Sequence, residues 1–188
     1  MAFTVVYDAC VLYPASVRDL LMRIAQSGVV RARWTDRILD ECFLNLAADR
    51  PDLSAEHLTR TRRLMCEAVP DCLVRSHTLV TVDAPLPDPD DRHVLAAAVA
   101  CGAQAIVTFN LADFPASVLA PFGMEAKHPD AFVLDAISLE PALLLTIIEQ
   151  QRAALRRPPV TQKELFAILR ARGLVASVAQ LEELGGTA

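Results

Sequence analysis

Short apolar segments that stop at a polar side chain alternate with helical segments in the N-terminal part of the chain. Residues 3–7 stop at Asp8, and residues 105–109 stop at Asn110. This alternation is typical of an α/β fold with a mostly parallel sheet. In such a sheet the strands end at one edge, where binding and catalytic sites collect. The pattern therefore predicts the fold class and the edge at which a site should lie.

Helix boundaries are marked by side chains that can cap a free helix end. We expect helices to begin at six such residues, namely Ser16, Thr35, Ser54, Asp88, Thr161 and Ser177. Two short apolar segments, residues 73–74 and 79–82, are bounded by residues that break regular structure and are weaker strand candidates. After about Asp130 the pattern is helical only. We therefore expect an α/β domain over residues 1–128 and a C-terminal helical extension over 129–188.

Composition excludes several classes of protein. Of the 188 residues 53% are hydrophobic and 22% charged, which is enough apolar content for a buried core and argues against disorder. No apolar run approaches the roughly 18 residues of a membrane span, and an N-terminus with Asp8 is unlike a signal peptide, so we expect a cytoplasmic protein. The net charge of -5 argues against a nonspecific nucleic-acid coat protein but not against a nuclease with a metal-masked acidic site.

Five cysteines, an odd number without C-x-x-C spacing, favour neither a disulfide framework nor a zinc site. The candidate ligands are oxygen-bearing side chains from distant parts of the chain: Asp8, Glu41, Asp88, Asp90, Asp91, Asn110 and Asp113. Such a set favours a hard cation, Mg²⁺ or Mn²⁺, which suits attack of water on a phosphodiester. Each residue also has a simpler explanation as a helix cap, a helix-dipole partner or a turn residue.

Four segments resemble, in order, the motifs of the PIN-domain ribonucleases. They are Val5-Val-Tyr-Asp8, Trp34-Thr-Asp-Arg-Ile-Leu-Asp-Glu41, Asp91-Arg-His-Val-Leu-Ala-Ala-Ala98 and Ile106-Val-Thr-Phe-Asn110-Leu-Ala-Asp113-Phe114. Each motif is weak alone, whereas four in order are specific. The resemblance covers roughly residues 3–125 and is strongest to the bacterial VapC-like group of toxin–antitoxin systems.

The resemblance implies a three-layer α/β/α domain and a Mg²⁺- or Mn²⁺-dependent endoribonuclease that leaves a 5′-phosphate and a 3′-hydroxyl. It implies that Asp8, Glu41 and Asp91 are catalytic and bind the metal. The fourth acidic position falls on Asp113, which we expect to be catalytic, or on Asn110. The remaining supporting residues are Thr108, Asp88 and Asp90.

The same resemblance implies an RNA substrate and a small cognate antitoxin, and we expect a homodimer. Arg60, Arg62 and Arg63, on one helix, are candidates for contacts with RNA phosphates, although a solvated helix face is the simpler explanation for them.

Other functions fit less well. A haloacid-dehalogenase phosphatase needs a second aspartate where Cys10 stands, and a receiver domain has little support from the two lysines, Lys127 and Lys163. A helix-turn-helix over residues 161–184 carries few cations, so packing on the domain is the simpler interpretation. The alternative of a different class is a non-catalytic RNA- or protein-binding module with a vestigial acidic site.

Overall fold

The computed structural model describes residues 3–75 and 82–186 and contains one parallel sheet. Its strands are β1 (Phe3–Tyr7), β2 (Val30–Arg33), β3 (Ala105–Val107) and β4 (Glu125–Lys127), in the order β2-β1-β3-β4. All three strand pairs are parallel. This confirms the predicted α/β fold class and places β1, with its terminal Asp8, in the middle of the sheet.

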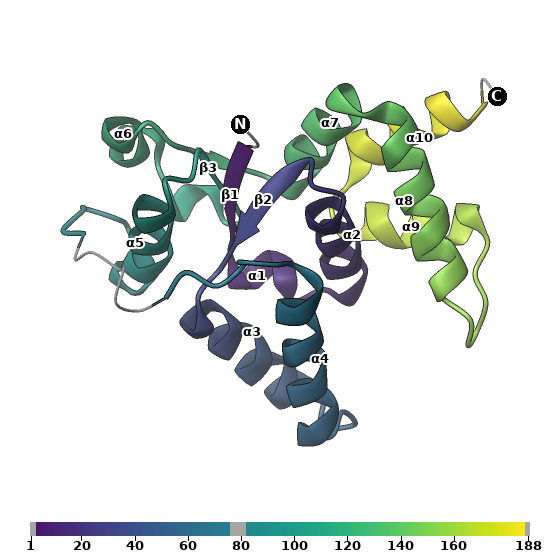
Figure 1. Ribbon diagram of the computed structural model, residues 1–188, viewed down its shortest axis with the longest axis horizontal. Coiled ribbons are helices and arrows are strands. Elements are labelled where there is room, and N and C mark those ends of the chain that lie inside the picture. Colours follow the sequence, from purple (N-terminus) through teal and green to yellow (C-terminus); the bar gives the residue numbers. More distant parts are fainter. Residues whose placement is uncertain (1–2, 76–81, 187–188) are drawn as a thin grey trace.

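Helices cover both faces of the sheet, as a three-layer α/β/α arrangement requires (Figure 1). The α-helices are α1 (Ala9–Leu12), α2 (Ala15–Gln26), α3 (Asp36–Asp49), α4 (Ala55–Ala68), α5 (Arg92–Cys101), α6 (Ala116–Leu119), α7 (Pro129–Leu139), α8 (Pro141–Ala154), α9 (Gln162–Ala171) and α10 (Val175–Gly186). Short 3₁₀ turns are η2 (Pro89–Asp91), η3 (Leu111–Asp113) and η4 (Ala120–Phe122). In Figure 1, α5 lies on one side of β1, whereas α2 and the C-terminal group α7–α10 lie on the other.

Most of the predicted capping residues act as caps. Thr35 and Ser54 accept hydrogen bonds from backbone N–H groups in the first turns of α3 and α4, and Thr161 forms a capping box with Glu164. The predictions for Ser16 and Ser177 are wrong. Helix α2 already begins at Ala15, and Ser177 lies inside α10, where it is fully buried.

The apolar segment at residues 3–7 matches β1, whereas the segment at residues 105–109 is longer than β3. Strand β3 stops at Val107, because the Thr108 hydroxyl accepts the N–H of Asn110 at 3.0 Å and turns the chain. The pair 73–74 forms no strand, since only Leu73 makes an isolated bridge to Trp34. Of the candidate at 79–82, residues 79–81 lie outside the described part of the chain.

The C-terminal helices share the core of the sheet. Tyr7 of β1 is fully buried, stacks on Trp34 with ring centroids 6.2 Å apart, and meets Phe132 of α7 edge-on at 5.8 Å. Its hydroxyl donates to the carbonyl of Leu21 at 3.2 Å. Helices α2 and α7 therefore fix the end of β1 immediately before Asp8. Over residues 3–75 and 82–186, no helix is long and apolar enough to cross a membrane.

Candidate active site

An acidic cavity lies where the central strand β1 ends. Its volume is about 460 Å³, and it is lined by Asp8, Ala9, Cys10, Tyr13, Glu41, Asn45, Asp49, Asp91 and Asn110. The structure thus brings together side chains from four separate segments of the chain, as the position of strand ends in a parallel sheet predicts. Three carboxylates singled out in the sequence, those of Asp8, Glu41 and Asp91, are among them.

Asp8 is the most rigidly held of these carboxylates. Only 6% of it is exposed. Its Oδ1 accepts the N–H of Ala9 at 2.7 Å, and its Oδ2 accepts the Thr108 hydroxyl at 2.8 Å and the Cys10 thiol at 3.1 Å. The backbone N–H of Asp8 donates to the carbonyl of Val107 at 3.1 Å, which ties it to β3. These hydrogen bonds orient the carboxylate, and none of their donors carries a positive charge.

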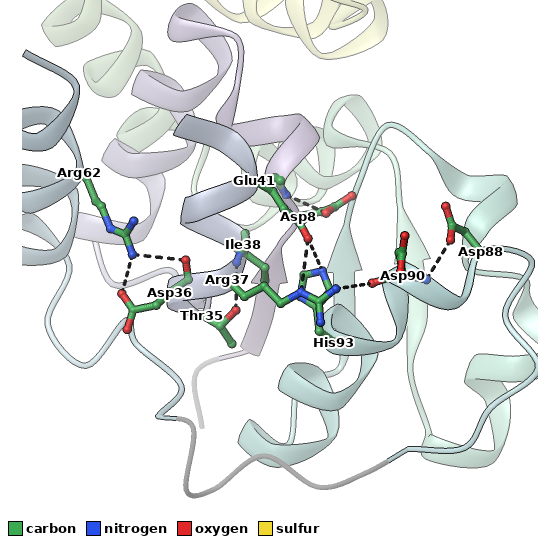
Figure 2. A network of polar contacts seen from close by, with 11 residues as sticks. Asp8, Thr35, Asp36, Arg37, Ile38, Glu41, Arg62, Asp88, Asp90 and His93 are labelled. Carbon is green, nitrogen blue, oxygen red and sulfur yellow. Dashed lines mark hydrogen bonds and ion pairs between the residues drawn. The ribbon is translucent and has the colours of Figure 1, made fainter. Parts of the chain in front are cut away.

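Glu41 reaches the cavity from α3 and is held against α5 (Figure 2). Its Oε1 lies 2.8 Å from His93 Nε2 and 3.6 Å from Arg37 Nε. Burial, followed by the charges of Asp8 and Asp90, raises the pKa of Glu41, and Arg37 partly opposes this. Burial also lowers the pKa of His93 to about 4, so this imidazole is neutral near pH 7.

Asp91 ends the 3₁₀ turn η2 and leads into α5. Burial raises the pKa of Asp91 to about 6, and the charges of Asp8, Asp113, Asp88 and Glu41 add to the effect. A carboxyl surrounded by other carboxylates holds its proton more tightly, because its ionisation adds one more negative charge to the group. The same excess charge attracts a cation.

The remaining candidate residues differ in whether they line this cavity. Asn110 lines it, whereas Asp113 does not, although the charge of Asp113 reaches Asp91. The Asp88 side chain caps η2 by accepting the N–H of Asp90 at 2.8 Å. Asp90 is exposed, and its carbonyl accepts a 3.5 Å bond from Arg37 (Figure 2). Of the two candidates for the fourth position, Asn110 is therefore the one on the cavity wall.

Sequence reasoning missed several residues of the cavity wall. Tyr13, Asn45 and Asp49 line the cavity, and the Tyr13 hydroxyl donates to Asp49 Oδ2 at 2.7 Å. Cys10 also lines the cavity, and its thiol donates to Asp8 Oδ2 at 3.1 Å. Asn45 and Asp49 follow Glu41 at intervals of four, which is the spacing of one helix face and the signal that could have revealed them.

Two of the three candidate arginines on α4 are already paired with acidic side chains. Arg62 binds Asp36 at 2.8 Å (Figure 2). It also binds Asp40, so it joins α4 to α3. Arg63 binds Glu67 at 2.7 Å. For Arg60, which is exposed, the described residues provide no ion pair. The structure therefore gives Arg62 a role in holding the two helices together.

The oxygen ligands around the acidic cavity fit a hard divalent cation in their chemistry. Asp8, Glu41, Asp91 and Asn110 offer carboxylate and amide oxygens on one cavity, where burial first and the neighbouring carboxylates second raise the pKa of Asp91. Within residues 3–75 and 82–186, no three His, Cys, Asp or Glu side chains are already close enough to enclose an ion. Binding therefore requires the carboxylates to approach one another, or water to complete the coordination.

A larger cavity of about 920 Å³ lies elsewhere. It is lined by Arg33, Asp36, Cys66, Asp71, Cys72, Leu73, Val74, Arg75, Ala100 and Cys101. Cationic, acidic and thiol groups are mixed on its wall, and none of the candidate catalytic residues reaches it. Size alone does not identify a site, so the clustered carboxylates decide in favour of the smaller cavity.

Comparison with known proteins gives matches in both parts of the chain. A family model described as "PIN domain" matches residues 4–112, and one described as "VapC50 C-terminal domain" matches residues 129–183. A relative from Mycobacterium tuberculosis (strain ATCC 25618 / H37Rv), named "Putative ribonuclease VapC50", is 43% identical over 79 residues, which are 42% of this chain and 47% of the relative. The matched part thus spans about half the length of that relative. No solved structure matches the chain.

Proposed function

Because the chain belongs to the PIN-domain family, we propose that it is a metal-dependent endoribonuclease and the toxin of a toxin–antitoxin pair. The observation that carries this proposal is the convergence of Asp8, Glu41 and Asp91, from three separate segments, on one cavity at the end of β1. The match to a relative whose name includes "ribonuclease" supports RNA as the substrate.

Asp8 and Asp91 would hold Mg²⁺ or Mn²⁺, with Glu41 and Asn110 completing the set directly or through water. When bound, such an ion lowers the pKa of a water molecule and neutralises the charge of the attacked phosphate. Thr108 and Cys10 keep Asp8 Oδ2 in one direction through bonds of 2.8 and 3.1 Å. In the absence of a cation, the carboxylates repel the RNA backbone.

The neighbouring residues have supporting roles in this proposal. His93 and Arg37 hold Glu41 from α5 and from α3, respectively. Asp113 and Asp88 add negative charge near Asp91 without lining the cavity. Asp113 therefore contributes to cation affinity through its charge, and Asn110 fills this position, directly or through water.

The expected partners are RNA and a small antitoxin, and a cytoplasmic location follows from an RNA target. We propose a boundary between residues 128 and 129, because residues 129–183 match the family model "VapC50 C-terminal domain". The two parts share one core, into which α7 packs. Equilibrium sedimentation tests the expected homodimer.

Cleavage of a 5′-labelled single-stranded RNA tests the proposal. We expect cleavage with Mg²⁺ or Mn²⁺, none with EDTA, and products with a 5′-phosphate and a 3′-hydroxyl. Asp8→Asn and Asp91→Asn should each lower the rate by at least about 100-fold, because loss of a direct ligand costs more than the roughly 10- to 100-fold of an outer contact. Asp52→Asn, which changes an exposed carboxylate paired with Arg50, should retain the wild-type rate.

Two results would contradict the proposed function. A folded wild-type protein that binds RNA but leaves it intact with either metal would favour the non-catalytic binding module. In cells, induced expression should arrest growth, and Asp91→Asn should relieve the arrest. Arrest that persists with Asp91→Asn would contradict a toxic nuclease activity.

A further inference from the structure

Three aromatic and backbone groups from separate segments meet beside the acidic cavity. The rings of Phe109 and His128 are packed edge-to-face, with centroids 5.2 Å apart and an interplanar angle of 73°. The backbone of Gly173, between α9 and α10, closes over both rings: a Cβ at this position would lie 3.5 Å from His128 Cε1 and 3.7 Å from Phe109 Cε1. Gly173 also has a φ of +89°, which favours glycine. The C-terminal helices thus touch the segment that carries Asn110.

His128 is fixed by the C-terminal part of the chain. Its Nδ1 accepts the N–H of Asp130 at 3.1 Å and so caps α7. The Asp130 carboxylate accepts the N–H of Ala176 at 2.9 Å and both the N–H and the hydroxyl of Ser177, at 2.8 and 2.6 Å. These bonds join the first turns of α7 and α10. The imidazole is therefore held in place by two helices that follow the sheet.

Phe109 carries this contact into the cavity. Its backbone N–H donates to Cys10 Sγ at 3.3 Å, and the Cys10 thiol donates to Asp8 Oδ2 at 3.1 Å. The next residue, Asn110, lines the cavity, and its N–H donates to Thr108 Oγ1 at 3.0 Å. A displacement of the Phe109 backbone would therefore disturb both the Asp8 carboxylate and Asn110.

We infer that His128 is a positioning residue of the acidic cavity, through which the C-terminal helices hold Phe109 and thereby Asp8 and Asn110. The inference goes beyond the proposed function, since it assigns a task to residues outside the acidic group. The expected effect of His128 on RNA cleavage rests on the proposed function, whereas its expected effect on the backbone of Phe109 does not. Contacts of this kind fix the direction of ligand side chains, and their loss costs about 10- to 100-fold in metal affinity or activity.

Two substitutions separate the positioning role of His128 from its role as a cap. His128→Asn retains a side-chain acceptor for the N–H of Asp130 and removes the ring from Phe109. His128→Phe retains a ring against Phe109 and removes the acceptor. If His128 only caps α7, the larger effect should appear in His128→Phe, which lacks the acceptor. If His128 positions Phe109, the larger effect should appear in His128→Asn, which lacks the ring.

The measurements are amide hydrogen exchange of Phe109 and Asn110 in the metal-free protein, Mn²⁺ affinity by calorimetry, and the kcat and KM of RNA cleavage. For His128→Asn we expect exchange at Phe109 to be about 10-fold faster. Mn²⁺ affinity and kcat should each fall about 10-fold, with KM for RNA within about twofold. His128→Phe should stay near wild type in these quantities and lose a few degrees in Tm, roughly as a missing cap predicts.

Wild-type exchange at Phe109 in His128→Asn would overturn the inference, as would equal changes in both variants. If the wild-type protein cleaves no RNA but the exchange rates separate as expected, the positioning role is supported and the proposed nuclease function is contradicted. If the wild type cleaves RNA and His128→Asn does so equally fast, the nuclease function is supported and the inference fails.

Discussion

Glu41 Oε1 and His93 Nε2 lie 2.8 Å apart and connect α3 to α5 across one side of the acidic cavity. The direction of the contact is not that of a hydrogen bond, and within the described residues neither His93 ring nitrogen has a hydrogen-bond partner. Only 8% of the His93 side chain is exposed. We therefore expect this neutral, buried imidazole to position Glu41 by contact rather than by charge.

His93→Leu tests this positioning. We expect Mn²⁺ affinity to fall about 10-fold, because Glu41 loses the neighbour that fixes its direction. The free energy of unfolding should change by less than about 1 kcal/mol, since leucine also removes two buried nitrogens without hydrogen-bond partners. Calorimetric titration with Mn²⁺ measures the first quantity and urea unfolding the second. Arg37→Gln, at the more distant and exposed ion pair, serves as the control and should have the smaller effect on affinity.

The pH dependence of stability should report on Asp91. Its pKa in the folded protein is raised to about 6, so its contribution to stability is complete below its unfolded value and is lost as the pH rises through about 6. Asparagine does not titrate. The Tm of metal-free Asp91→Asn, minus that of the wild type, should therefore become more positive as the pH rises from about 5 to about 7.

His93 acts in the opposite sense over part of this pH range. Its pKa is lowered to about 4, so its contribution is present above its unfolded value and is lost as the pH falls toward 4. Because His93 is common to both proteins, comparing wild type with Asp91→Asn isolates Asp91. A Tm difference that does not vary with pH would contradict the raised pKa.

Divalent cations should stabilise the folded protein. Mn²⁺ or Mg²⁺ bound to the carboxylates offsets their mutual repulsion, and a ligand at about 100 times its Kd adds about 2.7 kcal/mol to the free energy of unfolding. Thermal unfolding with and without millimolar metal measures the shift, and EDTA should reverse it. Asp8→Asn should remove most of the shift. An equal shift in wild type and Asp8→Asn would assign the stabilisation to another site.

Arg60 and Arg62 should behave differently although they lie on the same helix. Arg62→Gln breaks the ion pairs with Asp36 and Asp40, so we expect it to lower the free energy of unfolding by about 0.5–1 kcal/mol and to leave KM for RNA unchanged. Arg60→Gln should leave stability unchanged, and any increase in KM should appear in this variant. Urea unfolding and cleavage kinetics check both. An increased KM confined to Arg62→Gln would reverse this assignment.

Local chemistry explains why much of the fold was predictable from the sequence. Thr35, Ser54, Asp88 and the Thr161–Glu164 box act within a few residues of their positions in the chain, so their caps can be inferred from spacing. Strand β4, with the sequence Glu-Ala-Lys, has no apolar pattern and forms because β3 offers an open edge. Such an edge depends on the tertiary structure and leaves no local signal.

The acidic cavity was predictable in outline because Asp8 and Asn110 follow apolar strands. The partners of its residues were not. His93 meets Glu41, and Cys10 meets Thr108, across 52 and 98 residues of sequence in the two cases. Neither pair has a spacing that marks it, since these contacts arise from how α3, α5 and the sheet pack together.

We expect the acidic cavity to bind a divalent cation through side chains from distant segments of the chain. Anomalous scattering from crystals of the wild-type protein soaked in Mn²⁺ locates the ion and the side chains that hold it. We expect a strong peak in contact with the carboxylates of Asp8 and Asp91, and loss of that peak in Asp91→Asn. A peak only at other acidic groups, or no peak in crystals whose cavity is open to solvent, would contradict it.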